Sequence, residues 1–378
     1  MRAWMLQKLL PFWADVGVDR RHGGFVERLT LDRRPAPDDY KRVRVQARQI
    51  YVFSHAHLLG APSWAMQTAR HGADFLFRHC WDDEAGGWLH LVAPDGTPLD
   101  RRRDTYDQAF VLHALAWLYR ATGDLDVLAG IDRSVAFLDA QLADPAGGGF
   151  WEEMTPEGAT DRLPRRQNPH MHLLEAFLAL HQATDDRAWL DRAGNIVRLF
   201  HDRLFDAATG SLGEFFARDW RPAAGTEGRI REPGHHFEWV WLLLHYRRLT
   251  GDGTVLAPAN ALYGFAREKG LIEHGGNPPR AVDSVSDDGA VLAGSARLWP
   301  QTEAVKAALA REELLGEVAA RLDADRFLTT VFEYLQGEDK VVWQDQIARD
   351  GTAMAEYIPA STLYHLFLCL SEYLRVRG

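Results

Sequence analysis

Gly23-Gly24-Phe25 is the first copy of a glycine signature that returns along the chain at steps of about 62 residues. The further copies are Gly86-Gly87-Trp88, Gly147-Gly148-Gly149-Phe150, Gly210-Ser211-Leu212-Gly213, Gly275-Gly276 and, more degenerate, Gly337-Glu338-Asp339. Six units of this length account for all 378 residues. A repeat of this period indicates one closed solenoid, so we expect a single domain over residues 1–378.

The segments between the glycine signatures have the hydrophobic periodicity of helices. Apolar residues recur at steps of three and four, which places them on one face of an α-helix. This pattern predicts helices over residues 43–59, 105–119, 127–142, 170–181, 237–246 and 361–373. Each signature, with its flanking aromatic and alternating polar residues, predicts a short β-hairpin whose turn needs glycine at positive φ.

Two helices in each of six repeats predict the fold class, an all-α (α/α)6 barrel with short β-hairpins in the connecting loops. In this six-hairpin toroid every second helix would line a central cavity. Polar residues do gather near the starts of alternate predicted helices, namely Arg44, Gln46, Arg48 and Gln49; Asp104, Tyr106, Asp107 and Gln108; Gln167, Asn168, His170, His172 and Glu175; His235, His236, Glu238 and Trp239; Trp299, Gln301 and Glu303; and Ser361, Thr362, Tyr364 and His365. A core avoids so many buried donors unless they face a wet pocket, so we expect a sugar-sized site.

Composition excludes several classes of protein. The net charge of −10 argues against nucleic-acid binding, which selects a basic surface. The only cysteines, Cys80 and Cys369, lie in apolar helical context and predict two free thiols in a reducing compartment. The first residues lack the pattern of a signal peptide, and no apolar run approaches the roughly 18 residues of a membrane span. We therefore expect a cytoplasmic protein, a monomer or homodimer, with no nucleic-acid or membrane partner.

Three histidines, His172, His235 and His365, lie near the starts of alternate predicted helices in distant repeats. Each alone could be a structural histidine, but three at matched positions favour one site for proton transfer, since the unperturbed pKa of histidine is about 6.5. Asn168 and Glu175 share the helix face of His172. Glu238, three residues after His235, is expected to orient that imidazole.

Metal and nucleotide cofactors are not predicted. His235 and His236 are adjacent on a helix and point about 100° apart, so they cannot easily share one ion. There is no His-Glu-x-x-His motif, no Gly-x-Gly-x-x-Gly after a strand and no phosphate loop. Trp239 and Trp299 leave two interpretations open, either core packing or a wall on which a sugar stacks.

Six stretches together resemble the N-acylglucosamine 2-epimerase superfamily over essentially the whole chain. They are Gly23-Gly24-Phe25-Val26-Glu27-Arg28, Val45-Gln46-Ala47-Arg48-Gln49, Asn168-Pro169-His170-Met171-His172-Leu173-Leu174-Glu175-Ala176, Pro233-Gly234-His235-His236-Phe237-Glu238-Trp239, Trp299-Pro300-Gln301-Thr302-Glu303 and Pro359-Ala360-Ser361-Thr362-Leu363-Tyr364-His365. The last stretch looks most like the bacterial D-mannose isomerase branch. The resemblance implies a six-fold α/α barrel that isomerises or epimerises a monosaccharide without a cofactor.

The resemblance also implies roles for individual residues. His365 would take the C2 proton of the sugar and return it, and Arg48 would stabilise the developing negative charge. His235, held by Glu238, would serve ring opening, and His172 with Asn168 would hydrogen-bond the reacting oxygens. The residues expected to bind the substrate are Tyr106, Asn168, Glu175, Trp239, Trp299, Gln301 and Glu303.

Four functions therefore compete at this point. The favoured one is a cofactor-free isomerase acting on D-mannose, and on lyxose, through an enediolate. The second is a sugar 2-epimerase of the glucose, N-acylglucosamine or cellobiose type. A glycoside hydrolase would need two carboxylates, for which Glu238 and Glu303 are the attractive pair, and the fourth function is a non-catalytic sugar- or partner-binding protein. The stretches 223–231 and 273–288 lack strong periodicity and are the candidates for loops that limit substrate size.

Overall fold

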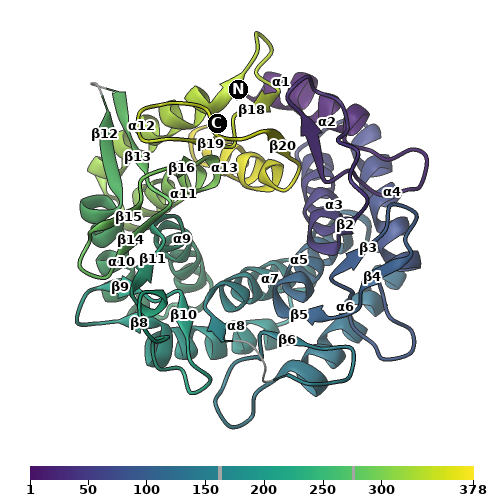
Figure 1. Cartoon of the computed structure of the whole chain (residues 1–378), viewed down its shortest axis with the longest axis horizontal. Coiled ribbons are helices and arrows are strands. Elements are labelled where there is room, and N and C mark those ends of the chain that lie inside the picture. The colour runs from purple at the N-terminus through teal and green to yellow at the C-terminus, as the bar shows by residue number, and fades with distance from the viewer. Residues whose placement is uncertain (161–163, 275–276) are drawn as a thin grey trace. The chain divides into compact units, whose positions relative to one another are not determined.

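The computed structural model describes residues 1–160, 164–274 and 277–378, and is built mainly of helices joined by loops with short strands (Figure 1). The chain forms two compact units. The first unit contains Ala3–Ile196 and Pro359–Tyr364, and the second contains Met1–Arg2, Val197–Ile358 and His365–Gly378. The expectation of one catalytic domain over the whole chain stays a prediction.

In the first unit, one row of helices is covered by a second row. Helix α3 packs against both α4 and α5, and α5 packs against both α6 and α7, so that α3, α5 and α7 form the inner row. Helix α5 is buried on every face, whereas α4 buries one apolar stripe, as expected for a covering helix. The helices here are α2 (Leu10–Val16), α3 (Val43–Leu58), α4 (Trp64–His79), α5 (Thr105–Thr122), α6 (Leu125–Phe137) and α7 (Asn168–Thr184), with short turns α1 (Arg2–Trp4), η1 (Met5–Leu9) and η2 (Leu138–Leu142).

The second unit repeats this alternation. Helix α9 packs against α10 and α11, and α11 packs against α12. Its helices are α9 (Pro233–Thr250), α10 (Leu256–Lys269), α11 (Leu298–Leu315), α12 (Val318–Tyr334) and α13 (Thr362–Arg377), with η3 (Phe200–Leu204), η4 (Glu227–Arg229) and η5 (Gly253–Val255). The division between the units passes through α8 (Ala188–Leu199) and through α13, after Tyr364. Inner and outer helices thus alternate in both units, as the repeat predicts.

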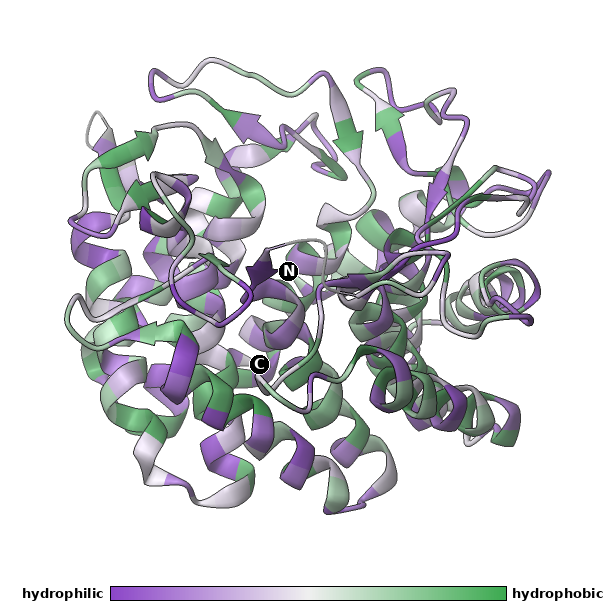
Figure 2. Ribbon diagram, turned by 60° about the horizontal axis from the view of Figure 1, so that its bottom comes forward, coloured by the Kyte–Doolittle hydropathy of each residue, from purple (hydrophilic) through white to green (hydrophobic). Residues whose placement is uncertain are grey.

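The strands are short and lie in the loops, where hydrophilic residues are common (Figure 2). Within the first unit β2, β3 and β4 form one sheet and β5 pairs with β6; within the second, β8 pairs with β9, β12 with β13, β16 with β19 and β17 with β18, and β11, β14 and β15 form a sheet. Their bounds are β1 (Arg28–Thr30), β2 (Lys41–Arg42), β3 (Leu91–Val92), β4 (Pro98–Asp100), β5 (Arg103–Asp104), β6 (Glu153–Met154), β7 (Arg165–Arg166), β8 (Phe205–Asp206), β9 (Ser211–Leu212), β10 (Phe215–Phe216), β11 (Ile230–Arg231), β12 (Leu271–His274), β13 (Asn277–Ala281), β14 (Ser284–Ser286), β15 (Val291–Ala293), β16 (Ala296–Arg297), β17 (Leu335–Gln336), β18 (Val342–Trp343), β19 (Gln346–Ile347) and β20 (Tyr357–Pro359).

The glycine signatures form the predicted turns. In the first three repeats the turn is closed by a single antiparallel bridge, such as that between Trp81 and Trp88. In the fourth and sixth it connects β8 to β9 and β17 to β18, while Gly275-Gly276 lies outside the described residues. Gly87 shows why glycine is required, because its φ is +83° and a Cβ atom there would lie 2.5 Å from the Phe137 ring.

An inner-helix side chain clamps the backbone just after each of five glycine signatures. Gln46 accepts from the Phe25 amide at 2.7 Å and donates to the Phe25 carbonyl at 3.0 Å. The same clamp is made by Gln108 on Trp88, by Gln301 on Ala281 and, through a ring nitrogen that accepts from the amide, by His170 on Phe150 and His236 on Leu212. Many of the polar residues predicted to face a wet pocket therefore satisfy buried backbone groups instead.

The two histidine clamps make the fold sensitive to acid. Each ring accepts through Nε2 and donates through Nδ1 to a carbonyl, that of Arg166 for His170 and that of Glu232 for His236, so each must be neutral. Burial lowers the pKa of His170, and that of His236, to about 4. The unfolded chain takes up these protons near pH 6.5 and the folded chain only near pH 4, so stability falls as the pH drops through this window.

We expect each histidine to cost about 3 kcal/mol of unfolding free energy between pH 7 and pH 4. The double variant His170→Gln/His236→Gln keeps both clamps, as glutamine does in other repeats, and should remove much of this loss. Urea unfolding of both proteins at pH 7, 5.5 and 4 measures the difference. Equal losses of stability in the two proteins would contradict the assignment.

Candidate active site

The first unit brings the predicted cation, Arg48 on α3, against aromatic side chains of α5. Its Nη2 atom donates to the Tyr106 hydroxyl at 2.7 Å, and its guanidinium carbon lies 4.1 Å from the centre of the Phe110 ring. This stacking fixes the plane of the guanidinium group. Its buried Nε atom has no acceptor among the described residues. A ligand oxygen would satisfy this donor.

His172 and Asn168, both on α7, lie in the same unit. The Nδ1 atom of His172 lies 3.0 Å from Glu175, and the other oxygen of Glu175 accepts from the Tyr364 hydroxyl at 2.5 Å. Glu175, predicted to bind substrate, is buried and uses its oxygens to hold His172 and Tyr364 instead. The buried Oδ1 atom of Asn168 has no donor in the described part of the chain, and a sugar hydroxyl would supply one.

His235, at the start of α9 in the second unit, is held by two carboxylates. Its Nδ1 atom lies 2.9 Å from Glu214 and 3.7 Å from Glu232. Burial disfavours the charged imidazole, but the neighbouring carboxylates outweigh it and raise the pKa of His235 to about 9. The predicted partner, Glu238, is not the residue bonded to Nδ1, because a side chain in the first turn of a helix leans toward the preceding loop. His235 is therefore an imidazolium at neutral pH and suited to act as an acid.

His365, on α13, is paired in a similar way. Its Nδ1 atom lies 2.8 Å from Oε1 of Glu303 on α11. The Trp299 ring, one turn earlier on α11, lies 5.6 Å from the His365 ring and 4.9 Å from the His235 ring. Trp299 thus packs between the two catalytic candidates of this unit. Glu303 is fully buried, so it orients His365 rather than contacting substrate as predicted.

Two other predicted substrate-binding residues have packing roles. Trp239 is fully buried and stacks on Phe200 with ring centres 4.6 Å apart. Gln301 clamps Ala281 and also donates to the Arg297 carbonyl. These placements favour the core interpretation for both residues. Glu238 is turned toward Glu303 and His365, and ligand atoms of the three lie within 4.8 Å of one another.

The sequence analysis missed Glu214, although the repeat carries a signal for it. An acidic residue lies two positions after the clamped residue in several repeats, and Glu27, Glu152 and Asp283 each bind an arginine just before the next inner helix. In the fourth repeat that arginine is replaced by Glu232. Glu214 has no arginine there and turns to His235. A departure from the repeat therefore marks the functional position.

The two stretches predicted as loops that limit substrate size meet each other in the second unit. Ile230 and Arg231 of β11 pair with β14, and β14 pairs with β15. Arg229 adds ion pairs of 2.8 Å with both Asp287 and Asp288. These segments are short strands rather than irregular loops, apart from residues 275 and 276, which lie outside the described residues.

Clusters of potential metal ligands occur within each unit, and cations of the protein already contact two of them. In the group His90, Asp104 and Asp107, Arg44 lies 3.0 Å from Asp107. In the group Glu238, Glu303 and His365, Lys306 lies 2.6 Å from Glu303. His235 and His236 turn to different partners, as predicted. The expectation of a metal-free site stays a prediction.

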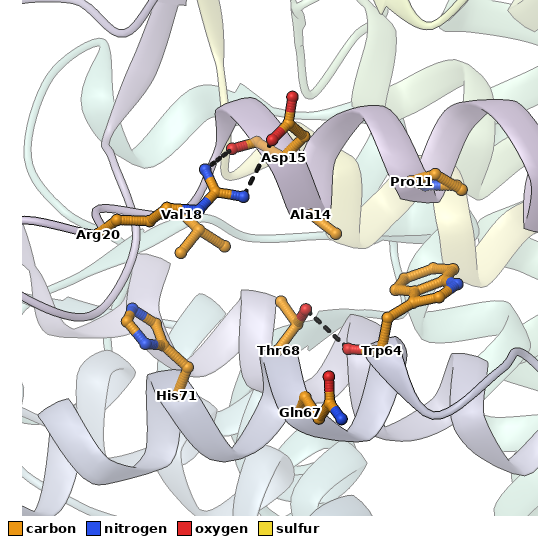
Figure 3. Close-up of a pocket in the computed structure, with 9 residues that line it drawn as sticks. All are labelled: Pro11, Ala14, Asp15, Val18, Arg20, Trp64, Gln67, Thr68 and His71. Carbon is orange, nitrogen blue, oxygen red and sulfur yellow. Dashed lines mark hydrogen bonds and ion pairs between the residues drawn. The ribbon is translucent and has the colours of Figure 1, made fainter.

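A cavity of about 560 Å³ lies elsewhere in the first unit, between α2 and α4 (Figure 3). It is lined by Pro11, Ala14, Asp15, Val18, Arg20, Trp64, Gln67, Thr68 and His71. Arg20 is tied to Asp15, and the Thr68 hydroxyl donates to the Trp64 carbonyl. None of the predicted site residues lines this cavity.

The chain belongs to the N-acylglucosamine 2-epimerase family, whose model matches residues 23–369. It is 36% identical to the mannose-6-phosphate isomerase of Rhizobium meliloti (strain 1021), over 98% of this chain and 95% of that protein. It is 29% identical to the D-mannose isomerase of Thermobifida fusca, over 84% and 79% of the two chains. The structure of cellobiose 2-epimerase from Spirochaeta thermophila DSM 6192 matches with a TM-score of 0.87 and 27% identity, covering 99% and 95% of the chains.

These comparisons confirm the predicted fold class, the (α/α)6 barrel, and the resemblance from which it was drawn. They also define the activity at a coarse level: the protein is a sugar isomerase or 2-epimerase. Among the residues that the structure describes, none of the helices is long and apolar enough to cross a bilayer.

Proposed function

We propose that this enzyme is an aldose–ketose isomerase that interconverts D-mannose and D-fructose, and also lyxose and xylulose. The observation that carries the proposal is the pairing of His365 with Glu303. Because the carboxylate holds Nδ1, the imidazole is oriented to take a proton through its other ring nitrogen, Nε2. His235, raised in pKa by Glu214 and Glu232, is the complementary acid.

The reaction follows from this division of roles. His365 removes the proton from C2 of the open-chain aldose, and the electron pair moves through C1 to the carbonyl oxygen O1, which forms an enediolate. His235 donates a proton to O1. Loss of the O2 proton and return of the carbon-bound proton to C1 give the ketose. No net oxidation occurs, since the electrons only move between C1 and C2.

The enediolate must be stabilised, because a proton next to an aldehyde is too weakly acidic for imidazole alone. A fixed cation and neutral donors in a dry pocket lower the energy of such a charge by several kcal/mol. Arg48 has the required charge, and Tyr106, Asn168 and His172 have the hydroxyl, amide and imidazole groups. That these residues of the first unit and the histidines of the second surround one sugar stays a prediction, tested by whether variants in both units lose turnover.

A 2-epimerase is the second candidate, since the same enediolate can be protonated at C2 from the opposite face. It would need a second base across the ring, and His235 is the candidate for it. The pKa of about 9 favours an acid rather than a base at this position. The similarity to a D-mannose isomerase also supports isomerisation.

The proposed substrate is the free sugar rather than its phosphate. Arginines at or beside the starts of inner helices each contact a carboxylate, as in the pairs of Arg44 with Asp107 and of Arg297 with Asp283, both at 3.0 Å. A phosphate group would have to compete with these carboxylates for the same cations. One relative is named for mannose 6-phosphate, which makes this sugar the matched comparison.

The glycoside hydrolase alternative is disfavoured by the position of Glu303. A glycosidase needs two carboxyl groups that flank the scissile bond. Glu303 is fully buried, and its oxygens are engaged by His365 and by Lys306.

Incubation of the purified enzyme with D-mannose, D-mannose 6-phosphate and cellobiose tests the proposal directly. We expect fructose from mannose, little turnover of the phosphate and no new disaccharide, all measurable by anion-exchange chromatography. Glucose as the first product of mannose would assign a 2-epimerase instead. A clean preparation that gives neither fructose nor glucose would overturn both assignments.

A further inference from the structure

Lys306 is a fully buried lysine on α11 that no motif of the sequence analysis included. Its ammonium nitrogen lies 2.6 Å from Oε2 of Glu303, one helical turn earlier, and 4.3 Å from the centre of the Trp241 ring. A buried ammonium group is costly unless a carboxylate compensates it. The position of this charge therefore calls for an explanation beyond packing.

Glu303 is shared between two partners. Its Oε2 atom faces Lys306, and its Oε1 atom lies 2.8 Å from Nδ1 of His365. A lone carboxylate at that distance stabilises the protonated imidazole, whereas a carboxylate already paired with an ammonium group does so less. The charge of Lys306 therefore acts on His365 through Glu303.

The other ionisable groups around this cluster leave Lys306 as its balancing cation among the described residues. Glu238, from α9, is the second carboxylate close to His365. Cys369, one turn along α13, is a fully buried thiol whose pKa burial raises, so it is neutral. Glu372 lies 2.9 Å from Arg375 and 3.5 Å from His245, which offset its charge. Two carboxylates and one ammonium group thus face the imidazole.

We propose that Lys306 is a positioning residue that balances the charge of Glu303, so that His365 is a neutral base at neutral pH. The inference rests on the proposed function, in which His365 takes the C2 proton. His235 shows the opposite arrangement, because Glu214 and Glu232 both face it and no lysine contacts Glu214 among the described residues. One histidine–carboxylate pair is thus arranged as a base and the other as an acid.

The test is Lys306→Met, which keeps an unbranched apolar side chain and removes the charge. Without the ammonium group Glu303 should hold a proton on His365 more strongly. We expect the acidic limb of the kcat/KM profile to move up by at least one pH unit. Turnover should fall at least tenfold at pH 7 and recover at higher pH, with little change in KM. The exposed Lys269→Met, on α10, is the matched control and should leave the profile unchanged.

A readout that needs no turnover separates this inference from the proposed function. NMR titration of the His365 ring, assigned by its loss in His365→Ala, should show the same upward shift in Lys306→Met. A wild-type protein inactive on mannose would overturn the proposed function, while the titration would still decide the role of Lys306. An unchanged His365 titration would overturn the role of Lys306 even in an active isomerase.

The double variant Glu303→Gln/Lys306→Met removes both charges and keeps an acceptor for Nδ1. It should restore the acidic limb to within about half a pH unit of the wild type, whether or not Lys306→Met folds stably. A double variant that keeps the shifted limb, or that fails to fold, would show that charge balance is not what Lys306 supplies.

Discussion

The variant His365→Ala is expected to lose about 10³- to 10⁴-fold in kcat on mannose, because general acid–base groups contribute of this order. Glu303 holds Nδ1 of this imidazole, so no neighbouring residue can replace the proton-accepting nitrogen in the same orientation. Initial rates of fructose formation at pH 8 measure the effect. Binding of the open-chain analogue mannitol, followed by calorimetry, should be retained.

The control for this variant is Tyr373→Phe, which removes a hydroxyl bonded to Asp325 on the same helix. It should keep wild-type turnover. Added imidazole should partly restore activity to His365→Ala by occupying the space left by the ring. Turnover within tenfold of the wild type would show that the base lies elsewhere, and loss of mannitol binding would indicate a role in binding.

The variant Arg48→Met is expected to lower kcat/KM by about 10²- to 10³-fold, the effect of removing one group that stabilises a developing oxyanion. Arg48→Lys should recover only part of this loss. Lysine keeps the charge but lacks the planar group that stacks on Phe110 and donates to Tyr106. Steady-state kinetics on mannose measure both variants.

The matched control is Arg70→Lys, at an exposed position on the neighbouring helix α4, which should be neutral. Thermal unfolding of each variant checks that the fold is retained. If Arg48→Met and Arg48→Lys both remain within threefold of the wild type, the enediolate is stabilised by another group. A graded loss from arginine through lysine to methionine supports the role of a fixed cation.

Much of the fold could be predicted because the repeat reports on local geometry. Positive φ angles at Gly23, Gly86 and Gly148 require glycine wherever the hairpin turn recurs. The apolar periodicity of residues 43–59 and 105–119 likewise indicates a helix that must bury one face or more. These constraints act over a few residues, so they are legible in the sequence alone.

The candidate site could be predicted only in part, because identical residue types serve different purposes at adjacent positions. His235 and His236 are neighbours, yet carboxylates raise the pKa of His235 to about 9, whereas burial lowers that of His236 to about 4. The partners of these rings, Glu214 for one and the Leu212 amide for the other, lie more than twenty residues away. Helical spacing indicated Glu238 as the partner instead.

The sequence by itself determined the repeat, the alternation of helices, the turns that need glycine and the identity of the imidazoles and the guanidinium group. Only the tertiary structure decided which polar side chains clamp backbone, which carboxylate holds each histidine, and that a buried lysine shares Glu303 with His365. The physical reason is distance. Turn geometry and helix periodicity depend on neighbours in the chain, whereas the charge state of a buried group depends on neighbours in space.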